Sequence, residues 1–137
     1  MFSLIVFGSS ALKMELHIDI ELQGELLLVT ASGSLAFDVA LLLLKEVCDT
    51  AAEKQVNKIL VNSLAVEGEL STLERYSLGT EVAAYLQQRH IEARLAFVGK
   101  PPAIDGFGVR VAQNRGVTTE VFSSQEEARS WLDIWPS

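Results

Sequence analysis

The segment richest in reactive side chains runs from Asn62 to Arg75 and contains Ser71, Thr72 and Glu74. Ser71 and Glu74 have the Ser-x-x-Glu spacing of a capping box, so we expect Ser71 to begin a helix. As a cap alone, Ser71 contributes on the order of 1 kcal/mol to the stability of that helix. A hydroxyl at a helix N-terminus is also a suitable place for a phosphate, because the helix dipole and the free amides stabilise negative charge. Both roles stay open for Ser71.

Catalytic groups are sparse elsewhere in the chain. His17 lies on the polar side of an alternating segment, and His90 lies at the exposed end of an expected helix. Cys48 falls on an apolar helical stripe, where thiols are usually core residues rather than activated thiolates. A triad can assemble from distant positions, so an enzyme stays as the least favoured hypothesis. We expect no catalytic residue.

Cofactor and metal motifs are also weak. The Gly-Phe-Gly run at 106–108 lacks the third glycine of a dinucleotide loop, and the Gly-Lys pair at 99–100 is followed by proline. Glu67, Glu69 and Glu74 cluster after an expected strand, but without convergent partners they are typical of a solvated acidic loop. We therefore expect no cofactor and no metal site.

Hydrophobic periodicity predicts the elements that position these residues. Strict alternation from Glu15 to Leu22 predicts a half-buried strand, and a turn at Gln23-Gly24 joins it to a second strand as a hairpin. Beyond Gly33 the apolar spacing becomes helical. We expect a loop at 62–70, helices at 37–53, 72–89, 104–114 and 124–135, and strands at 15–22, 25–31, 56–61, 93–98 and 117–122.

The resulting order, β-β-α-β-α-β-α-β-α, predicts one α/β domain with a mixed, mostly parallel sheet of about five strands and about four helices. We place this domain at 14–137. The segment 1–13 is either an extra N-terminal strand or an extension upstream of a natural start at Met14. We favour the second interpretation, because Met14 immediately precedes the first clean pattern. An exposed strand at 2–7 would create a dimer edge, so a homo-oligomer is among the expectations.

Composition narrows the class of protein. A chain of 137 residues with 49% hydrophobic residues can bury a core as one domain, and its single cysteine cannot form an internal disulfide, which favours the cytoplasm. The longest apolar run, Val39 to Leu44, is too short to span a membrane. A net charge of -7 argues against nucleic acid as a partner. The stretch from Arg75 to Arg115 is nevertheless net basic, so Arg75, Arg110 and Arg115 are candidate anion contacts.

The order of elements, and the strand that leads through a loop to the helix-starting Ser71, resemble the STAS domain. This is the fold of bacterial anti-sigma-factor antagonists and of related SpoIIAA-like and CRAL-TRIO-like proteins. The stretches 109–116, 121–122 and 127–132 also look like the end of small STAS-like bacterial proteins. The resemblance covers about Met14 to Leu132 and implies a SpoIIAA-like fold. In the antagonists the phosphorylated residue follows an Asp in an Asp-Ser-Ser-Gly-like motif. Here the corresponding run at 69–73 is Glu-Leu-Ser-Thr-Leu, which lacks the Asp and the Gly of that motif. Ser71 falls where the family serine would lie, and Thr72 is the neighbouring candidate.

This resemblance implies a non-catalytic regulatory or interaction module, switched by phosphorylation at Ser71 or Thr72. Its partner would be a protein of the kinase or regulator type, and the expected partner surface comprises Glu67, Glu69, Glu74, Arg75 and Tyr76. The alternative is a small binding protein for an apolar or anionic, lipid-like ligand, as CRAL-TRIO-like relatives are. A pocket at 62–75 would favour the ligand, and an exposed surface would favour the protein partner.

Overall fold

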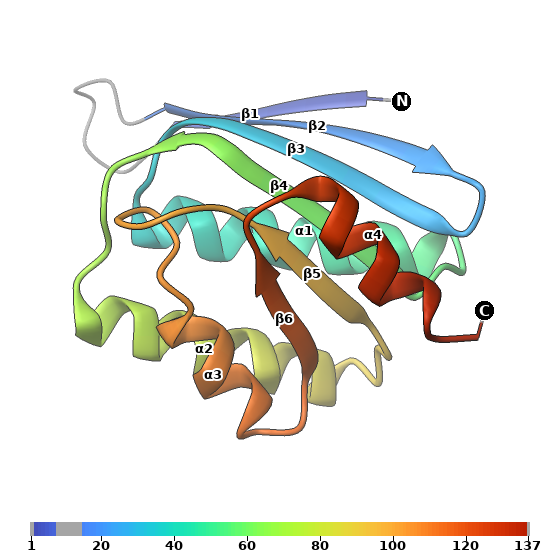
Figure 1. Cartoon of the computed structure of the whole chain (residues 1–137). Helices are drawn as coiled ribbons and strands as arrows, with labels where there is room; N and C mark the ends of the chain where they lie inside the picture. The colour runs from blue at the N-terminus through green and yellow to red at the C-terminus, as the bar shows by residue number, and fades with distance from the viewer. Residues whose placement is uncertain (1, 8–14, 137) are drawn as a thin grey trace.

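One mixed β-sheet organises the chain, and a computed structural model describes it for residues 2–7 and 15–136 (Figure 1). Within these residues the strands lie in the order β1-β2-β3-β4-β5-β6. The first three strands are antiparallel neighbours, and β3 to β6 run parallel. Their bounds are β1 (Phe2–Phe7), β2 (Glu15–Gln23), β3 (Leu26–Ser34), β4 (Lys58–Glu67), β5 (Arg94–Val98) and β6 (Thr118–Phe122).

Helices cover both faces of this sheet. Three helices connect the parallel strands and pack on one face of the sheet: α1 (Phe37–Glu53), α2 (Thr72–Gln88) and α3 (Phe107–Gln113) (Figure 1). The last helix, α4 (Gln125–Asp133), covers part of the other face (Figure 1). No helix in the described ranges is long and apolar enough to cross a membrane. The predicted order from the hairpin onward is confirmed. The strand β1 adds a sixth strand beside β2, and Met14 lies outside the described residues.

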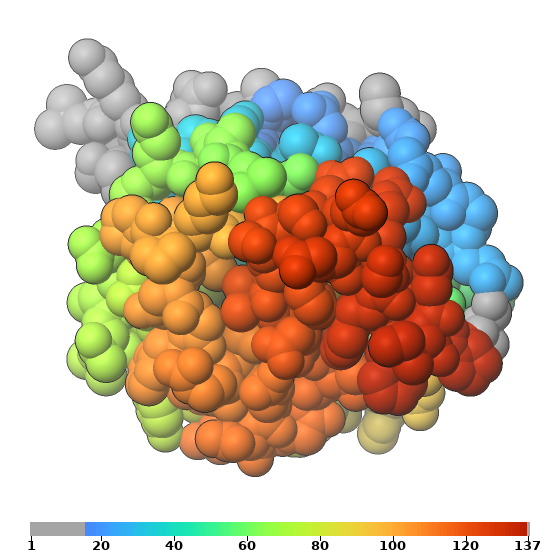
Figure 2. Space-filling model, viewed as in Figure 1, coloured from blue at the N-terminus to red at the C-terminus, as the bar shows by residue number. Residues whose placement is uncertain are grey.

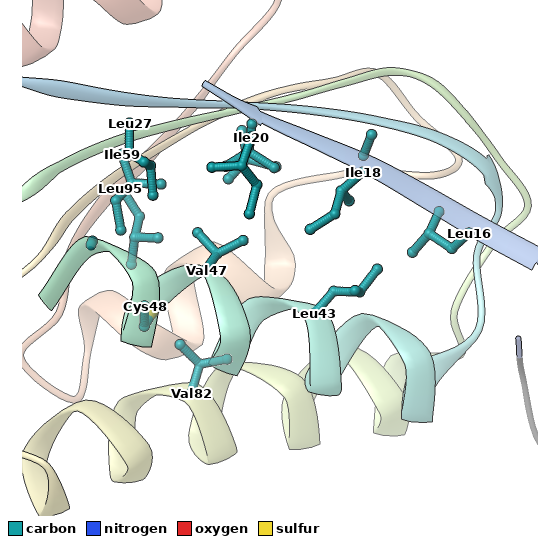
Figure 3. Close-up of a cluster of buried hydrophobic side chains, with 14 of the residues drawn as sticks. Leu16, Ile18, Ile20, Leu27, Leu43, Val47, Cys48, Ile59, Val82 and Leu95 are labelled. Atoms are coloured by element: carbon teal, nitrogen blue, oxygen red, sulfur yellow. The ribbon is translucent and has the colours of Figure 1, made fainter. Parts of the chain in front are cut away.

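The main core lies between the sheet and α1. Leu16, Ile18 and Ile20 project from alternate positions of β2 and are almost fully buried, with Leu43 and Val47 of α1 facing them (Figure 3). Burying such a side chain contributes about 1.5–3 kcal/mol relative to leaving it in water. The period-two pattern of the sequence therefore reports which face of β2 meets the helix layer.

A smaller core lies on the opposite face, beneath α4. Leu60 and Ala96 of the central strands pack there against Ala128 and Leu132 of the helix. Because a sheet covered on both faces needs apolar residues at consecutive positions, this arrangement accounts for the high hydrophobic fraction of the chain.

Several element boundaries differ from the sequence-based prediction: β3, for example, continues to Ser34 rather than ending near Ala31. Two other differences border the Ser71 segment. The strand β4 continues to Glu67 rather than ending near Val61, because its backbone pairs with β3 up to the Ser34–Glu67 register after a bulge between Thr30 and Ser32. The helix α3 begins at Phe107 rather than near residue 104, because residues 100–104 form a turn that the Ile104 N–H closes on the Lys100 carbonyl. Both differences lengthen the elements or loops that border the Ser71 segment.

Candidate functional site

The β4–α2 loop, residues 68–71, is held at both ends by hydrogen bonds. The Glu67 carbonyl accepts a hydrogen bond from the Leu35 N–H at 2.8 Å, and the side chain of Leu70 is buried within the loop. Ser71 Oγ accepts a hydrogen bond from the Glu74 N–H at 3.1 Å, and Glu74 Oε1 accepts one from the Ser71 N–H at 2.9 Å. The predicted capping box is therefore confirmed, and it fixes the start of α2.

Arg75 ties this loop to the β5–α3 loop, residues 99–106. Its side chain is only 12% exposed, and its Nη1 lies 3.0 Å from Asp105 Oδ2. Its Nη2 donates a hydrogen bond of 2.6 Å to the Pro102 carbonyl and lies 3.9 Å from Glu69 Oε2. Asp105 Oδ1 also accepts the Phe107 N–H at 3.0 Å, so one carboxylate holds Arg75 and the start of α3. The guanidinium is thus paired within the fold.

The outer side of the same segment is exposed. Ser71 and Thr72 face solvent, and the neighbouring Leu73 is 73% exposed although it is a large apolar side chain. Tyr76, one helical turn beyond Leu73, is also exposed, and its hydroxyl accepts a hydrogen bond from Arg115 Nη2 at 3.0 Å. We call the exposed residues Glu67, Glu69, Ser71, Thr72, Leu73 and Tyr76 the loop-helix surface.

Two hollows border the loop-helix surface. One lies between the end of β4 and the β5–α3 loop, has a volume of about 270 Å³, and includes Ser63, Glu67 and Lys100 in its walls. In the space-filling view the β5–α3 loop (light orange) lies beside the green end of β4 (Figure 2). The other lies between α2, α3 and the sheet, is almost wholly apolar, and measures about 90 Å³. Both are smaller than the roughly 300–1,000 Å³ of typical small-molecule pockets.

The glycines of α2 and α3 explain why the apolar hollow is small. A Cβ placed on Gly79 would lie 2.6 Å from the Gly108 carbonyl oxygen, and one on Gly108 would lie 3.3 Å from the Arg75 carbonyl oxygen. The two helices therefore approach at backbone distance, which only residues without a side chain allow. This contact also sets the position of Arg75 relative to the second loop.

The arginines that were candidates for anion contact have different surroundings. Arg75 is paired with Asp105, whereas the guanidinium of Arg115 lies 5.8 Å from the ring centre of Tyr76 and also hydrogen-bonds its hydroxyl. Arg110 is exposed. Of the predicted partner-surface residues, Glu74, Arg75 and Tyr76 lie in the first turns of α2. Glu69 lies in the preceding loop, 3.9 Å from Arg75, and Glu67 is the last residue of β4.

The histidines and the cysteine lie away from this segment. His17 Nε2 is 3.5 Å from Asp19 Oδ1, and Ser32 is the register partner of His17 on β3. An acid and a hydroxyl thus flank His17, but on the sheet rather than in one of the hollows bordering the loop-helix surface. Cys48 is fully buried, and burial raises the pKa of its thiol to about 12. Among the described residues no group of three or more His, Cys, Asp or Glu side chains is placed to hold a metal ion.

Two features of the site were missed by sequence reasoning. Asp105 and the Pro102 carbonyl are separated from Arg75 by about thirty positions, so no local spacing predicts their contact. The exposure of Leu73 could have been inferred, because it falls outside the apolar stripe of α2 that carries Val82 and Leu86.

Comparison with known proteins supports the fold. No protein-family model matches the sequence, and no curated protein matches it. An anti-sigma factor antagonist from Mycobacterium paratuberculosis has a similar structure, with a TM-score of 0.61 at 14% identity over 93% of this chain and 99% of that one. An uncharacterised protein with a SpoIIAA-like fold from Shewanella loihica gives a TM-score of 0.51 at 17% identity over 85% of this chain and 93% of that one. The predicted SpoIIAA-like α/β fold is therefore confirmed.

Proposed function

We propose that this SpoIIAA-like chain is a non-catalytic regulatory module that binds a protein partner through the loop-helix surface. Phosphorylation at Ser71, or at its neighbour Thr72, would switch that binding. The observation that carries the proposal is the exposure of Leu73, which is 73% exposed directly beside the two hydroxyl residues. A large apolar side chain exposed on an ordered helical turn is typical of an interaction surface.

The loop-helix surface is ordered before any partner binds. The capping box holds the first turn of α2, and Arg75 holds the two loops together through Asp105 and the Pro102 carbonyl. A surface that is already in place loses less conformational entropy on association than a mobile loop does. This order supports a docking role better than a role as a loop that closes over a substrate.

Phosphorylation of Ser71 would change the charge of this surface without refolding the domain. A phosphate adds about -1.5 to -2 charge at neutral pH, and the free amides of the first turn of α2 stabilise it. It would displace the Glu74 carboxylate from the capping box and add to the negative charge of Glu67 and Glu69. Thr72 offers a second site for phosphorylation, because this residue is exposed and its hydroxyl is not part of the capping box.

The type of partner is inferred by analogy. The similar structure from Mycobacterium paratuberculosis is an anti-sigma factor antagonist. Fold similarity alone does not transfer a role, so the residues of this chain must support it. We infer a regulator as the partner and a protein kinase as the source of the phosphate.

Charge variants test the switch directly. Ser71→Asp keeps a good helix cap while adding a negative charge, so a changed set of captured proteins would report charge rather than unfolding. Ser124→Asp is the matched control, because Ser124 caps α4 in the same way, accepting the Glu127 N–H at 3.2 Å. We expect the intact mass of the native protein to show an added phosphate, and peptide mass spectrometry to place that phosphate on Ser71 or Thr72. No phosphate, together with identical partners for wild type and Ser71→Asp, would refute the switch.

A second pair of variants tests the surface itself. Leu73→Ser should abolish partner capture, whereas Leu42→Ser, which removes a leucine that is 47% exposed on α1, should leave it unchanged. Equal capture by both variants would contradict the proposed surface. Native mass spectrometry of the same preparation should give the mass of the chain alone. A bound amphipathic molecule would instead favour the ligand-binding alternative.

A further inference from the structure

The carboxyl end of β4 extends beyond its neighbour β5. Strand β4 runs to Glu67, but its pairing with β5 ends at the Asn62–Val98 register. Within the described part of the chain, residues 63–67 therefore pair only with β3, and we call them the free edge of β4. In Figure 1 the green end of β4 continues past the tip of β5 before the chain descends to α2. An unpaired strand edge is a template for pairing with another chain.

The backbone groups of Leu64 and Val66 point away from β3. The Glu67 carbonyl accepts the N–H of Leu35, which directly follows β3, so the backbone groups of Glu67 face β3. The N–H and C=O of one strand residue leave the strand on the same side, and those of the next residue leave on the other side. The backbone groups of Val66 therefore face the side that β5 does not reach. The side chain of Val66 packs against the main core, so the fold fixes the position of this edge.

Most of the outward backbone groups have no partner within the fold. The Leu64 N–H donates to Asn62 Oδ1 at 3.1 Å, which leaves the Leu64 carbonyl and both backbone groups of Val66. Among the described residues, the β5–α3 loop forms no hydrogen bond with these groups and instead closes on itself, through the Ile104 N–H and the Lys100 carbonyl. The free edge thus presents one donor and two acceptors of a strand ladder.

A groove separates these backbone groups from the β5–α3 loop. This is the hollow of about 270 Å³ described above, with the free edge as one wall and residues 100–103 as the other. The free edge is about 16 Å long at roughly 3.3 Å per residue. The walls carry opposite charges, because Glu67 lies on the strand and Lys100 on the loop, and both residues are exposed. Neither is in an ion pair within the described residues.

We infer that the protein partner binds by adding an extended segment to the free edge of β4 as a further strand. Main-chain hydrogen bonds to Leu64 and Val66 hold the segment, as in other cases of strand addition. The segment carries a basic side chain beside Glu67 and an acidic one beside Lys100, because opposite charges stabilise neighbouring positions of a sheet. This inference rests on the proposed function and adds to it the form in which the partner binds.

A random peptide library displayed on phage and selected against the full chain supplies the probe. We expect the enriched peptides to share a lysine or arginine at one position. That preference should disappear when the selection is repeated on Glu67→Gln. It should persist on Glu53→Gln, the matched control, which removes an exposed carboxylate at the end of α1.

Two measurements on an enriched peptide distinguish strand addition from side-chain docking. In hydrogen exchange, the peptide should slow the Val66 amide by about 10-fold or more, whereas the Glu67 amide, which faces β3, should already be protected without it. N-methylation of the peptide at each position in turn should weaken binding by about 10-fold at alternate positions, because only alternate amides face β4. These tests leave the protein unmodified, so its folding is not in question.

Several outcomes would overturn the inference. These are a library that enriches no peptide, a Val66 amide that gains no protection, and binding that tolerates N-methylation equally at every position. The proposed function is judged separately by Leu73→Ser. Loss of partner capture in Leu73→Ser without protection of Val66 would leave a partner that docks through side chains alone. Unchanged capture in Leu73→Ser with protection of Val66 would refute the role of Leu73 and retain the added strand.

Discussion

Replacing Arg75 with methionine should release the β5–α3 loop from the start of α2. Methionine keeps most of the apolar stem of arginine but removes the guanidinium that binds Asp105 Oδ2 at 3.0 Å and the Pro102 carbonyl at 2.6 Å. The contact with Glu69 at 3.9 Å adds little, because that carboxylate is mostly exposed. The change therefore tests the Asp105 and Pro102 contacts together.

The expected loss can be bounded from the exposure of the partners. A buried charged hydrogen bond contributes about 1.5–3 kcal/mol, but Asp105 is 36% exposed, so water recovers part of its interaction. We expect Arg75→Met to lower the free energy of unfolding by about 1–2 kcal/mol. This is more than the loss of about 1 kcal/mol or less that is typical when a fully exposed ion pair is removed. For a domain of this size that corresponds to a fall of about 4–8 °C in the melting temperature.

Urea denaturation and hydrogen exchange provide the assay. A double-mutant cycle with Asp105→Asn isolates the pair, because asparagine keeps the oxygen that accepts the Phe107 N–H while losing the charge. Amides at 99–106 should exchange faster in Arg75→Met, whereas those of α1 should not change. Arg110→Met removes an exposed arginine of α3 and is the matched control. The reasoning is refuted if Arg75→Met costs no more than Arg110→Met, or if the coupling with Asp105→Asn is zero.

Three further predictions follow from contacts within the fold. Gly79→Ala should lower the free energy of unfolding, measured in urea, by about 1–2 kcal/mol despite its gain in helix propensity, because the added Cβ would lie 2.6 Å from a backbone oxygen. Gly108→Ala should cost less, because its Cβ would lie 3.3 Å from the nearest backbone oxygen. Ser71→Ala should cost about 1 kcal/mol by loss of the cap, and Ser71→Asp should restore most of it; equal melting temperatures for the two variants would contradict this. The Cys48 thiol should resist iodoacetamide in the native protein. Because its pKa is raised from 9.0 to about 12 on folding, the unfolded state loses the proton first, so stability should fall between about pH 9 and pH 12, and Cys48→Ala should lack that slope.

Local patterns predicted the elements well because their causes are local. The alternation of Leu16, Ile18 and Ile20 reflects the two faces of a strand, and each of these residues is buried. The capping box of Ser71 and Glu74 involves groups three residues apart, so its spacing is sufficient to place the start of α2. Each of these features depends on a few consecutive residues.

The sequence did not predict element boundaries or side-chain partners that depend on residues elsewhere in the chain. The strand β4 reaches Glu67 because β3 continues to pair with it, which no pattern within residues 62–67 reveals. Likewise Arg75 looked like a free cation in a basic stretch, and only the fold brings Asp105 to it. A charge counted in the sequence therefore does not report whether that charge is available at the surface.

By itself the sequence determined the α/β class, the order of the elements from the hairpin onward, the cap at Ser71 and the burial of Cys48. Periodicity and capping arise from contacts between residues a few positions apart, and such contacts can be predicted from the spacing of residues in the sequence. Only the tertiary structure decided that Arg75 joins two loops, that Leu73 is left exposed beside Ser71, and that the end of β4 extends beyond β5. These relations depend on strand register and on the crossing of helices, which bring together residues that no spacing along the chain connects.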